Sequence, residues 1–291
     1  MTTDTITRTD TDTRKHKGTG TGTDMSTGTT MGTHLRSELR KLTTTRLWWI
    51  LLLAVVVGSA GLTALVVSAG LGAPMSPLSF GSAAEAVPAY NLAVALAYVF
   101  PLAIGVVMVT QEYGSRTITA TLLSEPRRMR VFGAKVLVGL CTAFVYGAVS
   151  VAGSALVAAA LLSGHGEPAY LTDPAVLSAL AGSVVVMTLW GAIGVGLGAL
   201  VRNQAVAIVG ILLMTQFVEP TLRILASAMG HPGVGNFLPG GAGDTAAGGT
   251  IMTAAAGAEG AAQPLGFLVL ALYAVAVAAL GGLRFNRYEV A

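Results

Sequence analysis

Six long apolar runs, separated by shorter polar segments, follow one another from Leu47 towards the end of the chain. Residues 47–71 carry no charged side chain, and at about 1.5 Å per residue a helix of that length crosses a hydrocarbon core of roughly 30 Å. We therefore predict an all-α polytopic membrane protein with six transmembrane helices. The same criterion places the other five at 90–110, 136–163, 176–201, 205–221 and 265–283.

The composition supports this assignment. Of the 291 residues, 53% are hydrophobic and 11% are charged, whereas soluble domains usually have about a quarter charged residues. The net charge of +3 comes from lysines and arginines gathered at a few points, which is not the continuous basic face that nucleic-acid binding needs. We expect a lipid environment and no nucleic-acid partner.

The first 33 residues differ from the rest of the chain. They are a low-complexity run of threonine, glycine and charged residues, which is typical of disorder because such a segment buries too little apolar surface. We interpret 1–33 as a disordered tail and 34–291 as one membrane domain. Cys141 is the only cysteine, so no intramolecular disulfide is possible.

Lysines and arginines predict the orientation. Sixteen of the 17 lie before the first span, between the second and third, between the fourth and fifth, or after the last. Segments 72–89 and 164–175 contain none, and 222–264 contains only Arg223. Since cytoplasmic loops carry the basic residues, both termini are predicted to be cytoplasmic in a multi-pass protein of the cell membrane.

A short amphipathic segment precedes the first span. Leu35, Leu39 and Leu42 recur at helical spacing while basic residues point elsewhere, which indicates an interfacial helix. A solvated basic anchor is an equal alternative.

The loop from Gln111 to Lys135 is too long for a turn. Ser115 or Thr117 is placed to cap a short helix that has Ile118 and Leu122 on one face and ends before Pro126. This helix would form a compact protrusion on the cytoplasmic side.

Charged residues flank this predicted helix. Glu112 lies at the membrane boundary, where a carboxylate needs a partner, and Arg116 at i+4 is the nearest one in sequence. Arg127 and Arg128 follow Pro126, with Arg130 beyond them. For these arginines alone, orientation of the loop and contact with anionic lipid is the favoured interpretation.

Two further pairs stand out. Gly194 and Gly198 form a G-x-x-x-G pattern, which permits close packing of a second helix, more often within a subunit than across a dimer. Glu219 and Arg223 are placed to pair at i, i+4 if the fifth helix continues through Pro220. An interfacial ion pair without a role in transport is an equal alternative.

Known catalytic patterns are missing. The sequence has no phosphate-binding G-x-x-x-x-G-K-[ST], no H-E-x-x-H and no G-x-S-x-G. We expect no enzymatic activity, cofactor site or metal site on this chain. Secondary transport is the main rival function, but the central turns of the six predicted spans contain no ionisable residue to couple an ion to a substrate.

The order of these features resembles the membrane subunits of type-2 ATP-binding-cassette (ABC) exporters. The resemblance extends from Leu35 to the end of the chain. It rests on the interfacial helix, Glu112-Tyr113-Gly114 and the loop after it, the glycine-rich stretch 194–203, and Phe237-Leu238-Pro239-Gly240-Gly241-Ala242. The resemblance implies that the loop contains a coupling helix, and that the outer region of Glu219 and Arg223 is re-entrant and gates the substrate path.

The resemblance also implies the partners. They are a separate subunit that binds ATP and a second permease subunit, identical or not. The expected function is the permease half of an ABC transporter that exports, by efflux, a hydrophobic or amphipathic compound. A secondary transporter and a non-transporting membrane anchor or sensor are the alternatives.

Overall fold

The computed structural model describes residues 31–72, 78–115, 117, 127–250 and 262–287. These residues form helices joined by short connections, and no strand occurs among them. Within this part of the chain, six helical segments are long and apolar enough to cross a membrane. The prediction of an all-α, polytopic membrane protein with six spans is confirmed.

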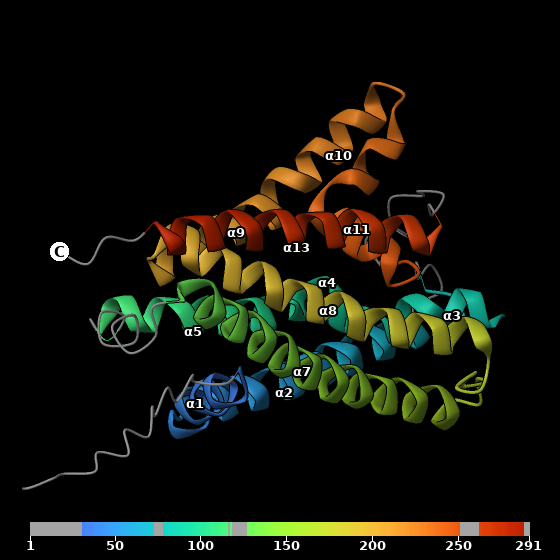
Figure 1. The fold of residues 1–291 in the computed structure, drawn as a ribbon. Helices are drawn as coiled ribbons and strands as arrows, with labels where there is room; N and C mark the ends of the chain where they lie inside the picture. Colours follow the sequence, from blue (N-terminus) through green and yellow to red (C-terminus); the bar gives the residue numbers. More distant parts are fainter. Residues whose placement is uncertain (1–30, 73–77, 116, 118–126, 251–261, 288–291) are drawn as a thin grey trace, which may run out of the picture.

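The spans run back and forth in one elongated bundle (Figure 1). We call the end that carries α1 and the end of α13 the terminal end, and the opposite one the distal end. In chain order the spans are α2 (Leu47–Gly72), α3–α4–α5 (Ala83–Tyr90, Leu92–Ala97, Val99–Gly114), α7 (Arg128–Gly164), α8 (Pro174–Val201), α9–η1–α10 (Gln204–Leu213, Met214–Val218, Glu219–Ala228) and α13 (Gln263–Asn286).

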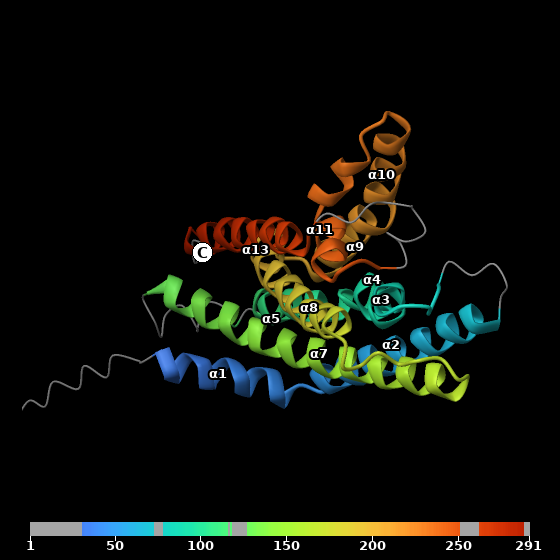
Figure 2. The same cartoon turned by 90° about the vertical axis from the view of Figure 1, so that its right-hand side faces the viewer.

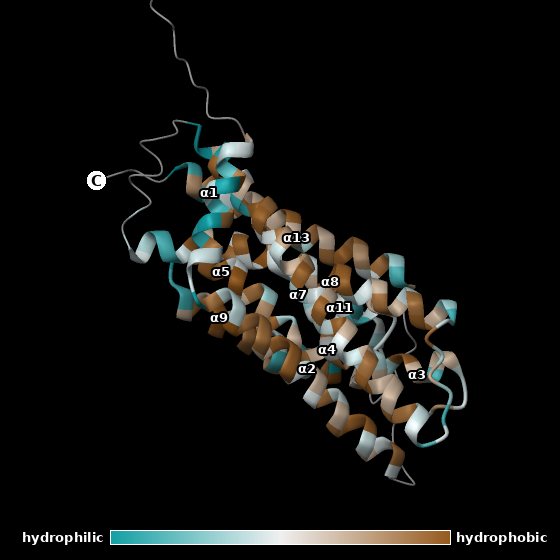
Figure 3. Cartoon of the chain, turned by 90° about the horizontal axis from the view of Figure 1, so that it is seen from below, coloured by the Kyte–Doolittle hydropathy of each residue, from teal (hydrophilic) through white to brown (hydrophobic). Residues whose placement is uncertain are grey.

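Polar residues gather at both ends of the bundle and apolar residues along its length (Figure 3). This distribution suits a membrane, because the hydrocarbon core excludes charged side chains while water and head groups accept them at either surface. The predicted interfacial helix is α1 (Met31–Thr44). Its Leu42 is buried and Leu35 packs against the same hydrophobic cluster, whereas Leu39 is exposed.

α8 occupies the centre and contacts α5, α7 and α13 (Figure 2). Glycines allow these helices to pack closely, as small residues do in membrane bundles. A Cβ on Gly194 would lie 2.9 Å from the carbonyl carbon of Leu102 on α5, and one on Gly198 would lie 2.8 Å from the carbonyl oxygen of Val106. The G-x-x-x-G pattern therefore faces a helix of the same subunit.

Several helix ends differ from the sequence-based boundaries. α7 begins at Arg128 instead of 136, so Arg128 and Arg130 lie in its first turn. No proline separates them from the apolar part, and charged side chains at a helix end can reach water. The second span begins at Ala83 and is interrupted near Asn91 and Tyr98.

The fifth span extends to Ala228, beyond the predicted end at 221. It contains a π-helical turn, η1, and Pro220 lies in the first turn of α10, where a missing N–H costs little. α10 leans away from the bundle, and η2 (Pro232–Phe237) and α11 (Pro239–Ala246) bring the chain back to α13 (Figures 1 and 2).

Candidate functional site

Four charged side chains meet at the terminal end, where α1 crosses α5 and α7. We call Glu38, Lys41, Glu112 and Lys135 the charge cluster. The Lys135 amine lies 2.8 Å from Glu38 Oε2 and 2.7 Å from Glu112 Oε1. The Lys41 amine lies 2.7 Å from Glu38 Oε1 and 2.6 Å from Glu112 Oε1. Each cation thus bridges both carboxylates.

Burial makes this cluster costly to disrupt. The Lys135 side chain is fully buried, Glu38 and Glu112 are nearly so, and only Lys41 is partly exposed. Burial alone would lower the pKa of Lys41, but hydrogen bonds to Glu112 and Glu38 outweigh it and raise the pKa. The lysine stays protonated, and the cluster has no net charge.

The cluster brackets the predicted coupling loop. In the structure Glu112 lies near the end of α5 and Lys135 in α7, on either side of the segment that joins these helices, while Glu38 and Lys41 come from α1. The short helix α1 is therefore joined by ion pairs to the helices on both sides of the loop. The expected partner of Glu112, Arg116, lies outside the described residues, as do Ile118 and Leu122. The partners that the structure gives Glu112 are two lysines distant in sequence.

Other predicted residues near the loop have structural contacts. Ser115 is the C-cap residue of α5, and its hydroxyl donates to the Gln111 carbonyl. The short helix that Ser115 or Thr117 was predicted to cap lies outside the described residues. Arg128 donates to the carbonyl of Asn286 at 3.1 Å, which joins the start of α7 to the end of α13. Arg127 precedes α7 and is exposed.

A second polar group lies towards the distal end, around Glu219. Its buried carboxylate accepts hydrogen bonds from the backbone N–H groups of Gly240 and Gly241, at the start of α11. This is a favourable place for an anion, because the first N–H groups of a helix have no partner within it. A Cβ on Gly240 would lie 2.7 Å from the carboxylate, so the glycine permits this approach.

Arg223 links two carboxylates. It lies 3.4 Å from Glu219 and 3.0 Å from Asp244 on α11. The structure thus places the predicted pair Glu219 and Arg223 together and adds Asp244, which the sequence analysis missed. We call Glu219, Arg223 and Asp244 the distal triad. It fastens α11 to α10, and therefore fixes the returning segment against the fifth span.

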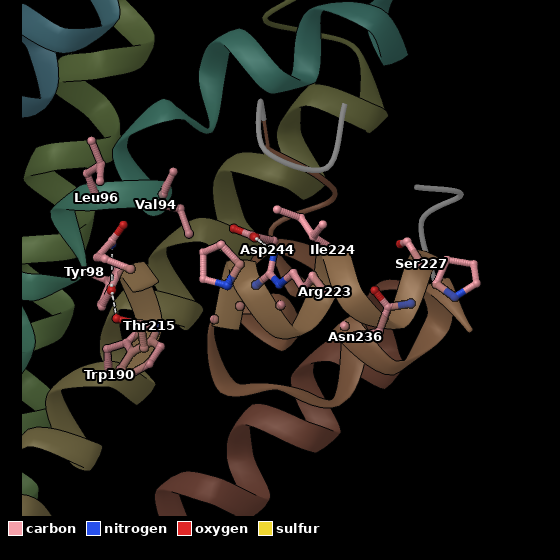
Figure 4. A pocket seen from close by; sticks show the side chains of 18 residues that line it. Val94, Leu96, Tyr98, Trp190, Thr215, Arg223, Ile224, Ser227, Asn236 and Asp244 are labelled. Atoms are coloured by element: carbon pink, nitrogen blue, oxygen red, sulfur yellow. Dashed lines mark hydrogen bonds and ion pairs between the residues drawn. The ribbon is translucent and has the colours of Figure 1, made fainter. Parts of the chain in front are cut away.

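Two members of the distal triad, Arg223 and Asp244, line a cavity of about 250 Å³. Figure 4 shows the Tyr98 and Trp190 rings to one side of Arg223 and Asp244. The cavity is lined by residues of the second, fourth and fifth spans and of the returning segment, among them Val94, Leu96, Tyr98, Trp190, Thr215, Gln216, Arg223, Ile224, Ser227, Asn236 and Asp244.

Irregular backbone positions the polar wall of this cavity. Thr215 and Gln216 lie in the π-helical turn and Tyr98 at the break between α4 and α5. The Tyr98 hydroxyl hydrogen-bonds the Thr215 hydroxyl, and it also accepts a hydrogen bond of 3.0 Å from the Gln216 side-chain amide. π-helical turns are frequent at functional sites. The turn in the wall of this cavity therefore also supports the cavity as a candidate functional site.

Asn91 is a further residue that the sequence analysis missed. It is fully buried, donates to the carbonyls of Ala247 and Gly249 and accepts from the Ser183 hydroxyl at 2.8 Å. It holds the first break of the second span against the end of α11. An isolated asparagine in an apolar run was the available signal, since a buried amide needs partners.

A protein-family profile described as "ABC-2 family transporter protein" matches residues 34–219, more than half of the chain. The chain belongs to the ABC-2 transporter family. No curated protein matches it closely enough to be reported as a relative. The resemblance to the membrane subunits of type-2 ABC transporters is confirmed, and this ABC-2 protein is a membrane permease subunit of an ABC transporter.

The matched residues include the whole charge cluster but end at Glu219. Arg223, Asp244 and the last span of this ABC-2 permease therefore lie beyond the matched range. Within the part of the chain that the structure describes, no group of three His, Cys, Asp or Glu side chains is placed to hold a metal ion.

Proposed function

We propose that this permease exports a hydrophobic or amphipathic compound across the cell membrane with energy from ATP hydrolysed by a separate subunit. The supporting observation is the charge cluster, which clamps α1 to both ends of the loop between α5 and α7 in a chain of the ABC-2 family. ABC-2 permeases typically pair with an ATP-binding subunit. The terminal end faces the cytoplasm in this proposal.

The mechanism follows from what the loop is attached to. Closure of the ATPase pair would push the segment around Ile118 and Leu122. Because Glu112 and Lys135 hold α5 and α7 to each other and to α1, the push would move these helices as one unit. Motion of packed spans then exchanges inward and outward access. Glu219 and Arg223, at the distal end, are proposed to form the outer gate.

A second permease subunit completes the proposed assembly. The first and fifth spans are the least buried within the subunit. Exposed apolar side chains such as Leu53, Leu65, Val209 and Phe217 lie along them. These faces suit a partner permease or membrane lipid, since both are apolar.

The first test is purification of the chain from its native membranes in mild detergent, followed by mass spectrometry. We expect a soluble ATPase with a phosphate-loop sequence at about equal abundance. Ile118→Asp or Leu122→Asp should release it, because a carboxylate disrupts an apolar docking face. The matched control is Leu171→Asp in an exposed distal turn, which should retain it. Retention by all three variants would contradict the docking role of the loop.

A second test concerns coupling. Glu112→Gln keeps the size of the side chain but removes one charge from the cluster, so we expect it to lower transport-coupled ATPase activity more than membrane insertion. Arg116→Ala should do the same if it also acts in the loop. Gln111→Ala is the control, because Gln111 is exposed beside Glu112. Coupling at the unmodified level in Glu112→Gln and Arg116→Ala would remove these residues from the mechanism.

Secondary transport remains the second candidate because of the distal triad. The sequence analysis found no ionisable residue in the central turns of the spans, but the fifth span is longer than predicted and Glu219 lies fully buried within it. A buried carboxylate within a span is the kind of group that couples an ion to a substrate. Solute transport in proteoliposomes driven by an ion gradient, with no ATPase bound, would favour this candidate over the ABC proposal.

A further inference from the structure

The distal triad beside the cavity has an uneven charge: Arg223 and Asp244 line the cavity, and Glu219 lies behind Arg223. Arg223 contributes one positive charge, and Glu219 and Asp244 contribute two negative charges in their ionised forms. Both terminal nitrogens of the guanidinium already face carboxylates: Nη1 lies 3.0 Å from Asp244 Oδ2 and Nη2 lies 3.4 Å from Glu219 Oε2. An incoming anion would have to displace one of them, whereas a cation would meet the excess negative charge.

The opposite part of the lining is aromatic. The ring centroids of Tyr98 and Trp190 lie 4.6 Å apart with a tilt of 32°. Both side chains are almost completely buried in the protein yet line the cavity. Aromatic faces attract cations, and more strongly where water is excluded. The hydrogen bonds of Tyr98 to Thr215 and Gln216 hold its ring in place.

We propose that this cavity binds an organic cation with an aromatic or aliphatic body, and that such a cationic amphiphile is the transported substrate. The substrate part of this assignment rests on the proposed export function; the binding part rests on the cavity alone. The charged group would lie between the aromatic pair and the distal triad, and the apolar body would lie along Val94, Leu96 and Ile224.

The size of the cavity limits the ligand. A cavity of about 150 Å³ admits benzene, so one of about 250 Å³ holds a molecule of roughly ten non-hydrogen atoms, or the head of a larger amphiphile. Benzyltrimethylammonium meets this limit. N-benzylacetamide and phenylmethanesulfonate have the same number of non-hydrogen atoms and the same benzyl group, but are neutral and negatively charged.

The experiment measures binding of radiolabelled benzyltrimethylammonium to the full chain in lipid nanodiscs, with empty nanodiscs subtracted. Unlabelled cation, amide and sulfonate then compete for the site. We expect saturable binding of the cation, at least about ten-fold tighter than either competitor. Competition by the sulfonate or the amide as effective as that of the cation, or no saturable binding at all, would overturn the proposal.

Variants locate the bound cation. Trp190→Leu should weaken binding about ten-fold because it removes an aromatic face, and Asp244→Asn should weaken it by removing a carboxylate. Ser178→Ala, at an exposed position of α8 outside the lining, should bind normally. Unchanged affinity in both Trp190→Leu and Asp244→Asn would place the ligand elsewhere and refute the site. If either variant does not fold, the three-compound comparison on the unmodified chain still decides.

The binding assay contains no ATPase, so its outcome is separate from that of the proposed function. Loss of cation binding in a chain that still purifies with its ATPase refutes this inference alone. Selective cation binding by a chain that never associates with an ATPase refutes the ABC mechanism and leaves the binding site in place.

Discussion

Lys135→Met is expected to lower the free energy of unfolding by about 3 kcal/mol, because breaking a buried ion pair from one side leaves its partners uncompensated. The Lys135 amine is fully buried and bridges Glu38 and Glu112. Without it, both carboxylates depend on Lys41, which is partly exposed. Unfolding of the purified chain in mixed detergent micelles measures the change.

The control is Arg130→Met, which removes an exposed basic side chain from the same helix and should change stability by no more than about 0.5 kcal/mol. The double variant Lys135→Met with Glu38→Gln restores charge balance, since one lysine then faces one carboxylate. We expect it to lose less stability than the sum of the two single changes, by roughly 1 kcal/mol or more. Equal losses in Lys135→Met and Arg130→Met would show that the cluster adds nothing to stability.

The sequence predicted the number and order of the spans because each span is a long, mostly apolar run bounded by polar segments. It did not predict where helices continue beyond the apolar run. α7 carries Arg128 and Arg130 in its first turn, and nothing in hydropathy distinguishes a charged helical turn from a charged loop. The π-helical turn and the break at Tyr98 were likewise not predicted.

The candidate site was predicted only where its partners are close in sequence. Glu219 and Arg223 are one helical turn apart, so helical spacing was enough to pair them. Glu112 was assigned to Arg116 by the same reasoning, but its partners in the structure, Lys41 and Lys135, are brought to it by the packing of α1 and α7. Such pairing depends on which helices are neighbours, and a single sequence does not contain that information.

The two ends of the protein use charge differently, and this bears on how they would work together. The charge cluster is balanced and nearly closed to solvent, so it is suited to hold helices together. The distal triad is unbalanced, and its Arg223 and Asp244 line a cavity, so it is suited to receive a ligand. α8 lies between the two and contacts both the second and the last span, which makes its packing the structural link between them.

Gly194→Ala tests this link. The new Cβ would overlap the carbonyl oxygen of Leu102, and backbone atoms cannot yield as a flexible side chain does. We expect α5 and α8 to separate locally, at a cost of about 1–3 kcal/mol in the free energy of unfolding, together with a loss of coupled ATPase activity in the presence of the partner subunit.

The matched control is Gly210→Ala in α9, where a Cβ would meet nothing within 4 Å. Alanine is the better helix former, so this variant should keep or slightly raise stability, by roughly 0.5–1 kcal/mol at most. The contrast matters more than either value, because both changes add the same methyl group to a membrane helix. If Gly194→Ala unfolded no more easily than Gly210→Ala, close contact between α5 and α8 would not be needed, and motion of the loop would have to reach the distal cavity by another route.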